Sequence, residues 1–94
     1  MPSNDPLAPP AIILDVRSRR EFDSGHVPGA RHLPFWAALT RRVPAAPDTP
    51  ITVYCGHGPR AWLAKAALSA RGFRRVRLLA GHMRAWRKAG RPLE

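Results

Sequence analysis

The stretch that decides the fold is ITVYCGHGPRAWLAKAALSAR, residues 51–71. It begins with a β-branched apolar run, ITVY, which predicts a buried strand over residues 51–54. The only cysteine of the chain, Cys55, follows directly, and two glycines and a proline come next. Residues 61–71 are rich in alanine and leucine and predict a helix, which Gly72 ends in left-handed backbone. A strand, a tight turn and a helix in this order are typical of a parallel sheet covered by helices.

The rest of the chain continues this alternation in both directions. Two more apolar runs predict strands, over residues 11–16 and 76–80, and three segments predict helices, from Ser18 to before Ser24, over 35–42 and over 82–88. The predicted fold class is α/β, with a small parallel sheet flanked by helices on both faces. We expect residues 11–94 to form one domain and the proline-rich residues 1–10 to be a flexible lead-in.

The apolar pattern also predicts which side chains reach the core. On the helix over 61–71, the face expected to be buried carries four residues: Leu63, Ala66, Ala67 and Ala70. Of the three tryptophans, Trp86 is expected in the core, and Trp36 and Trp62 in the core or at its rim. His26, in the loop GHVPGA over residues 25–30, is expected to bond backbone.

Composition limits the class of protein. The 94 residues allow one domain, a lone cysteine forms no internal disulfide, and neither a signal sequence nor an apolar run long enough for a membrane is present. We therefore expect a cytoplasmic protein. The net charge is +10, and residues 49–94 hold ten basic side chains against Glu94 alone. Such a field attracts anions, although the arginine excess is equally explained by a GC-rich genome.

Cys55 lies where a parallel sheet binds ligands, between the carboxyl end of a strand and the start of a helix. There the thiolate faces the positive end of the helix dipole. Gly56 and Gly58 allow successive amides to point inward as an anion nest, and Arg60 adds charge at the rim. The simpler interpretation of Cys55 is a small buried apolar residue. The glycine turn, the helix and Arg60 together favour a nucleophile.

Three segments together resemble the rhodanese family of sulfurtransferases. ILDVRSRREFDSGHVPGA is similar to the family's aspartate-arginine strand end and Gly-His-x-Pro-Gly-Ala loop, VYCGHGPRA to its active-site loop, and LLAGHMRAW to its closing Gly-Gly and tryptophan segment. The resemblance covers residues 11–90. Two departures stand out: Pro59 has no N–H to donate to the loop, and His82 replaces the second glycine of the closing segment.

The resemblance implies that Cys55 is the catalytic nucleophile and that the next five residues bind the substrate: Gly56, His57, Gly58, Pro59 and Arg60. It implies a persulfide intermediate on Cys55, formed from a small anionic donor such as thiosulfate or from a thiol persulfide. A thiol, cyanide or a protein would accept the sulfur, with no cofactor and no metal. His57 either contacts substrate or points to solvent. Asp15 and Arg17 either pair with each other or tie down the loop, and the alternative for Arg17 is a plain solvent-facing charge.

Other functions remain as alternatives. The related phosphatases with this fold have seven residues from cysteine to arginine, whereas Cys55 to Arg60 spans six, which favours sulfur over phosphate. A sulfur-relay or protein-binding module would keep the fold without turnover. Nucleic-acid binding by the arginines of residues 71–91 is less favoured, because only Phe73 and Trp86 could stack on bases. The scattered histidines lack the spacing of metal ligands.

Overall fold

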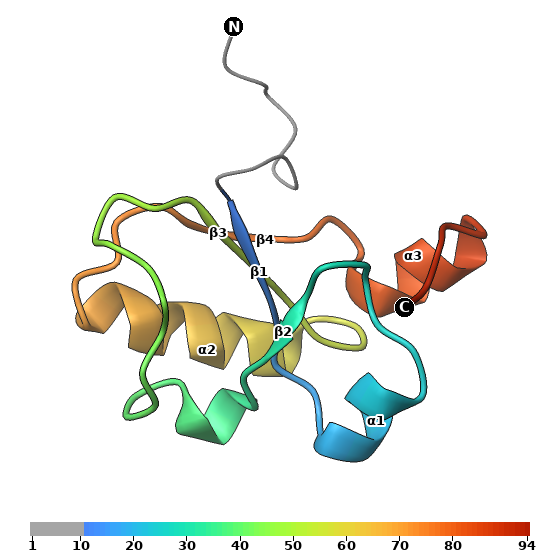
Figure 1. The fold of residues 1–94 in the computed structure, drawn as a ribbon, viewed down its shortest axis with the longest axis horizontal. Helices are drawn as coiled ribbons and strands as arrows, with labels where there is room; N and C mark the ends of the chain where they lie inside the picture. The colour runs from blue at the N-terminus through green and yellow to red at the C-terminus, as the bar shows by residue number, and fades with distance from the viewer. Residues whose placement is uncertain (1–10) are drawn as a thin grey trace, which may run out of the picture.

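In the computed structural model, which describes residues 11–94, a parallel sheet of four strands lies between helices (Figure 1). The predicted lead-in over residues 1–10 lies outside the described residues. The elements in chain order are β1 (Ile12–Asp15), α1 (Arg19–Asp23), β2 (Arg31–His32), the 3-10 helix η1 (Phe35–Ala37), β3 (Ile51–Tyr54), α2 (Pro59–Ala70), β4 (Val76–Leu78) and α3 (His82–Lys88). The predicted α/β class with a small parallel sheet is confirmed.

The strand order β2-β1-β3-β4 places β1 and β3 at the centre of the sheet. Ile12 pairs with Ile51 and Asp15 with Tyr54, so the two central strands end at the same level. Because all four strands are parallel, their carboxyl ends meet at one edge. Cys55 follows β3 at this edge, where open α/β sheets bind ligands.

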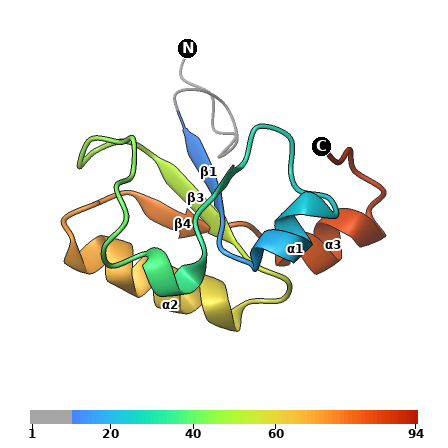
Figure 2. The same ribbon diagram turned by 60° about the horizontal axis from the view of Figure 1, so that its bottom comes forward.

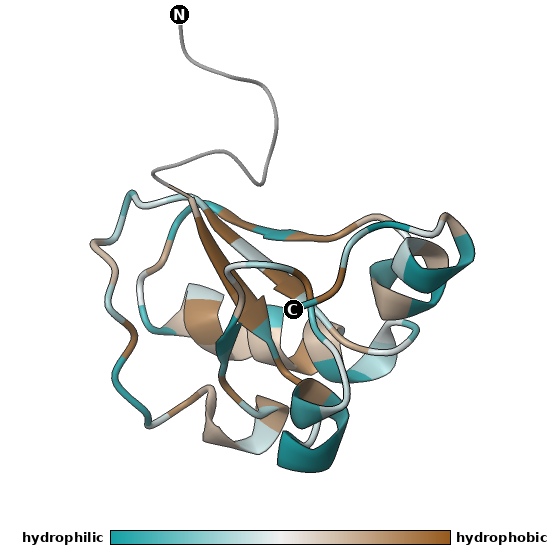
Figure 3. Ribbon diagram, turned by 45° about the vertical axis from the view of Figure 1, so that its right-hand side comes forward, coloured by the Kyte–Doolittle hydropathy of each residue, from teal (hydrophilic) through white to brown (hydrophobic). Residues whose placement is uncertain are grey.

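Each face of the sheet has its own apolar core. On one face, Ala61, Ala64 and Leu68 of α2 pack with Val53 of β3 and Ala37 of η1. On the other, α3 and the loop before β2 supply the buried apolar residues, among them Met83, Trp86 and Val27. Figure 2 shows α2 on one side of the strands and α1 and α3 on the other. Figure 3 shows that the strands are the most hydrophobic part, whereas the outer turns of the helices are hydrophilic. No helix in the described part of the chain is long and apolar enough to cross a bilayer.

Local signals in the sequence set several helix ends. The Ser18 hydroxyl accepts a bond from the Glu21 amide at 3.2 Å and the Glu21 carboxylate accepts one from the Ser18 amide at 3.1 Å, which is the predicted capping box of α1. After the C-terminal end of α2, Gly72 has φ +97°, and the Phe73 amide donates to the carbonyl of Leu68. The predicted stop at Gly72 is confirmed, and Phe73 packs back on the core.

Three predicted features of secondary structure were wrong. The helix expected over 35–42 is only the 3-10 turn η1, because the amides of Thr40 and Arg41 both bond the carbonyl of Ala37 and the helical pattern goes no further. The two-residue strand β2 was missed, since it is too short to show a period. The helix α2 begins at Pro59, two residues before the predicted start, because proline fits the first turn of a helix.

The predicted buried face of α2 was also wrong, except at Ala67, which is half-buried and packs against the core. The helix buries Ala61, Ala64 and Leu68, while Leu63 is 60% exposed. Small alanines allow the helix to approach the sheet closely, and an alanine-rich sequence does not reveal which alanines do so. Trp36 and Trp62 are not core residues either, being 68% and 60% exposed. Trp86, as predicted, is buried.

Candidate active site

The sulfur of Cys55 is enclosed by the turn that follows it. Cys55 is fully buried at the end of β3, and the amide of Gly58 donates a hydrogen bond to Sγ at 2.9 Å. Gly58 has φ +140°, a backbone conformation that favours glycine, and it is the residue before the first turn of α2. The glycine turn therefore aims an amide and the start of a 12-residue helix at the thiol.

The other residues of the loop differ in their surroundings. Pro59 is the first residue of α2, so its missing N–H would have had no helical partner. His57 is exposed, and with Gly56 it forms part of the wall of a cavity of about 270 Å³. A side chain at Gly56 would meet Nη2 of Arg60 at 3.3 Å, so the arginine takes the space that a larger residue would need.

Asp15 and Arg17 are buried behind the loop and form the pairing that the sequence allowed. Arg17 donates to Asp15 from its backbone amide, Nε and Nη2, the shortest bond being 2.7 Å, and Nη2 also donates to the carbonyl of Gly25. Tyr54 donates its hydroxyl to Asp15 at 2.8 Å and accepts a bond from the Val27 amide. Burial, together with Asp15, raises the pKa of Tyr54, which keeps the hydroxyl protonated as a donor. Arg17 is thus no solvent-facing charge, being 4% exposed.

Arg60 is engaged by α1. Its Nη1 and Nη2 donate to the two carboxylate oxygens of Glu21 at 2.6 and 3.2 Å. This bond is the main cause that lowers the pKa of Glu21 to about 2 and raises the pKa of Arg60, with a smaller contribution to Arg60 from Cys55. The sequence predicted a charge at the rim but not its partner, because the two residues are 39 positions apart.

The closing helix α3 contributes contacts that the sequence did not reveal. The amides of Met83 and Arg84 donate to the carbonyls of Cys55 and Gly56, both at 3.0 Å. His82 accepts a bond from the Cys55 amide on Nδ1 at 3.3 Å. Its φ is +55°, in the left-handed region that favours glycine.

His82 is also buried, and burial followed by the nearby His57 lowers its pKa. The neutral ring is therefore the form that accepts the Cys55 amide. The signal for this role was the histidine in a glycine position. His26 lies in the loop after α1, where its Nδ1 bonds the Phe22 carbonyl at 3.0 Å as expected.

Comparisons with known proteins agree with the fold. The family of the Rhodanese-like domain matches residues 3–89. A thiosulfate sulfurtransferase GlpE of Ectopseudomonas mendocina is 35% identical over 77 residues, which are 82% of this chain and 71% of that protein. The crystal structure of a Rhodanese_3 like domain of the Alr3790 protein from Anabaena superposes with a TM-score of 0.80 at 32% identity, covering 88% of this chain and 97% of that one. The human single-domain sulfurtransferase TSTD1 gives a TM-score of 0.76 at 26% identity, covering 83% and 81%.

Proposed function

This chain belongs to the rhodanese-like family, and we propose that it transfers a sulfane sulfur from an anionic donor to a nucleophilic acceptor through a persulfide on Cys55. The observation that carries the proposal is the bond of 2.9 Å from the Gly58 amide to Sγ of Cys55 at the start of α2. Amide donors and a helix N-terminus stabilise a thiolate and, still more, an anionic terminal sulfur. A cysteine that only filled the core would not need them.

The first half-reaction loads the enzyme. The Cys55 thiolate attacks the outer sulfur of thiosulfate, the sulfur–sulfur bond of thiosulfate breaks, and sulfite leaves with the electron pair. A thiol persulfide donates in the same way and leaves as a thiolate. The product is a persulfide on Cys55, and its negative charge is held by the amides of the loop.

The second half-reaction unloads it. Cyanide, a thiolate or a thiolate of a protein partner attacks the outer sulfur of the persulfide, and Cys55 leaves as a thiolate. No cofactor takes part, since every step exchanges one sulfur–sulfur bond for another bond to sulfur. Among the loop residues, Gly56 and Gly58 shape the backbone, Pro59 starts the helix, Arg60 provides charge for the substrate, and His57 provides a polar side chain at the rim.

The experiment is the intact mass of the protein after incubation with thiosulfate and removal of excess reagent. We expect a gain of one sulfur atom, lost on addition of cyanide with formation of thiocyanate. The variant Cys55→Ser is the matched control, because an alcohol in the same turn forms no persulfide. Uptake of sulfur by Cys55→Ser, or no uptake by the natural protein under any donor, would contradict the proposal.

A further inference from the structure

The cavity beside the catalytic loop has an unusual lining. Its volume is about 270 Å³, and its walls are formed by six residues: Arg17, Gly56, His57, Met83, Arg84 and Arg87. Three of these six are arginines and none is acidic. The cavity touches the loop through Gly56 and His57, the two residues after Cys55. An anion bound there would lie beside the loop that holds the reacting sulfur.

The three arginines are not equivalent. The charge of Arg17 is matched by Asp15 at 2.7 Å. In contrast, none of the ion pairs found within residues 11–94 includes Arg84 or Arg87. Both side chains belong to exposed residues three positions apart, so they lie on the same side of α3. Their positive charge is therefore available to a ligand.

The position of these two arginines relative to Cys55 is set by backbone bonds. The amides of Met83 and Arg84 donate to the carbonyls of Cys55 and Gly56, which joins the first turn of α3 to the loop. The guanidinium of Arg87 lies close to the loop after α1, because its Nη2 would be 3.3 Å from a Cβ atom placed on Gly25. The cavity and the loop thus form one site with two parts.

We propose that Arg84 and Arg87 form a subsite for the carboxylate of an organic thiol that accepts sulfur from Cys55, and of the corresponding persulfide when it donates. This inference rests on the proposed sulfur transfer. Thiosulfate has five non-hydrogen atoms and carries its charge next to the reacting sulfur, so it would leave this cavity largely unused. Sites for small organic ligands begin at about 300 Å³, close to the volume found here. The planar guanidinium matches a carboxylate better than any other anion-binding side chain.

The reaction at this subsite is balanced without another reagent. The thiolate of the acceptor attacks the outer sulfur of the Cys55 persulfide while its carboxylate is held by Arg84 and Arg87. The bond between the two sulfurs of the persulfide breaks, and Cys55 leaves as a thiolate with the electron pair. The acceptor becomes a persulfide, and the reverse reaction uses the same contacts.

The test compares two small acceptors that differ in the carboxylate. Protein loaded with thiosulfate and freed of excess reagent is mixed with 3-mercaptopropionate or with 2-mercaptoethanol, and the loss of the extra sulfur is followed by mass. Each second-order rate constant is expressed per concentration of thiolate. We expect the ratio of the constant for 3-mercaptopropionate to that for 2-mercaptoethanol to fall about 5-fold in the double variant Arg84→Gln/Arg87→Gln, as for the loss of two exposed ion pairs.

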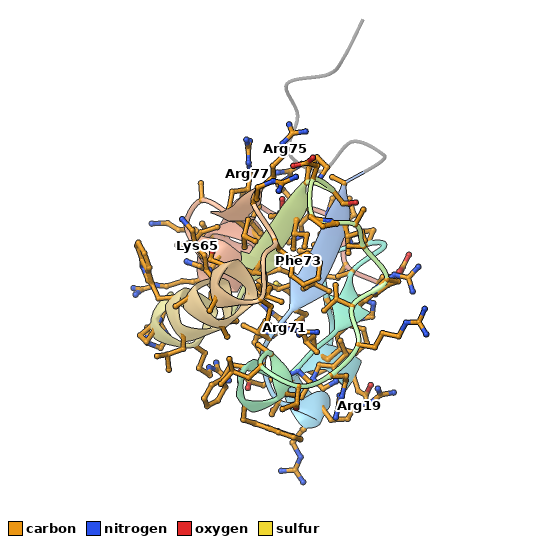
Figure 4. All side chains as sticks on the ribbon, turned by 90° about the vertical axis from the view of Figure 1, so that its left-hand side faces the viewer. Arg19, Lys65, Arg71, Phe73, Arg75 and Arg77 are labelled. Carbon is orange, nitrogen blue, oxygen red and sulfur yellow. The ribbon has the colours of Figure 1, made fainter. Side chains whose placement is uncertain are left out.

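The control variant is Arg75→Gln/Arg77→Gln, which removes the same charge far from the site. Figure 4 shows Arg75 and Arg77 projecting at the end of the sheet opposite to α1, which carries Arg19. We expect this variant to retain the ratio of the natural protein. An unchanged ratio in the α3 variant, or an equal fall in the control, would overturn the subsite, because the charge would then act only as a general field.

A binding measurement distinguishes failure of the subsite from failure of the proposed sulfur transfer. 3-(Methylthio)propionate has the carboxylate but no thiol, so its binding requires no chemistry at Cys55. We expect it to shift the backbone amide resonances of Gly56 and residue 84 in a saturable way. Its dissociation constant should be about 5-fold higher for the α3 variant than for the natural protein. Equal binding by both proteins would overturn the subsite even if Cys55 took up no sulfur.

Discussion

Two arginine–carboxylate pairs flank the loop that contains Cys55, and they differ in burial. Asp15 and Arg17 are 0% and 4% exposed, and Asp15 also receives the hydroxyl of Tyr54. Glu21 and Arg60 are 38% and 29% exposed, and each bonds mainly the other. The first pair holds the end of β1 against β3, whereas the second joins α1 to the start of α2.

This difference in burial indicates that Asp15 and Arg17 mainly stabilise the fold, whereas Glu21 and Arg60 mainly affect the charge beside Cys55. Removing one member of a buried pair leaves an uncompensated charge and costs far more than the pair itself contributes. A half-exposed pair is screened by water and contributes little to stability. Glu21 therefore has its main effect on the charge that Arg60 presents next to Cys55. In the proposed reaction, a negatively charged donor would compete with Glu21 for that guanidinium.

The largest effect is expected from breaking the buried pair. Asp15→Asn should lower the free energy of unfolding by about 3–5 kcal/mol, because Arg17 is left charged and buried. Urea denaturation of the purified proteins measures it. Tyr54→Phe, which removes one bond to the same carboxylate and one from the Val27 amide, should cost about 2 kcal/mol and serves as the control. Equal losses for the two variants would mean that the ion pair is no more important than a neutral bond.

A smaller effect, on rate, is expected from Glu21→Gln. Glutamine can still complete the capping box with Ser18, but it no longer neutralises Arg60. The rate of sulfur uptake from thiosulfate should rise about 3-fold, because one more free positive charge lies beside the loop. Intact masses of samples quenched at successive times give this rate. A slower uptake would instead show that Glu21 is needed to hold Arg60 in place.

A weaker effect is expected on the pH dependence of the unfolding free energy, through the pair of Glu21 and Arg60. The pKa of Glu21 is about 2 in the folded protein, against an ordinary value of 4.5. Since the folded state holds the proton less tightly than the unfolded state, the stabilisation is full above pH 4.5 and is lost as the pH falls toward 2. The difference in unfolding free energy between the natural protein and Glu21→Gln, under about 1 kcal/mol at neutral pH, should shrink over that range. A difference that grew on acidification would contradict the assignment.

The smallest effect is expected at a third pair, which completes the series. Asp48 and Arg74 bond at 2.8 Å but are 70% and 66% exposed. Asp48→Asn should leave the midpoint of urea unfolding unchanged within error, because water and salt screen this pair. A shift as large as that of Glu21→Gln would show that exposure does not rank these pairs.

The same pairs show what the sequence could predict. Asp15 and Arg17 are two residues apart at the end of a strand, so their pairing was visible, and only the burial of Arg17 was not. Glu21 and Arg60 are brought together by the fold across 39 positions, and no local pattern connects them. Predictions succeeded where a local rule fixes the backbone, as at the capping box of α1 and the glycine after α2. They failed where packing decides, as on the alanine-rich α2.

The candidate site divides in the same way. The loop from Cys55 to Arg60 is continuous in sequence, so its glycine turn and the helix after it could be predicted, although α2 begins two residues before the predicted start. The wall formed by α3 could not, because Arg84 and Arg87 look like ordinary surface charges until two backbone bonds place them beside the loop. A histidine in a position typical of glycine was the one local sign that this segment is special.

That histidine gives the turn after Cys55 a spectroscopic reporter. The Cys55 amide donates to Nδ1 of His82, which can accept only while that nitrogen carries no proton. In a nitrogen–proton NMR spectrum, the Cys55 resonance should therefore move as His82 takes up a proton, with a midpoint below the ordinary 6.5 because the pKa of His82 is lowered. Exchange of that amide with deuterium should become less protected over the same range. The titration of one side chain can thus be followed from within the loop without any substrate.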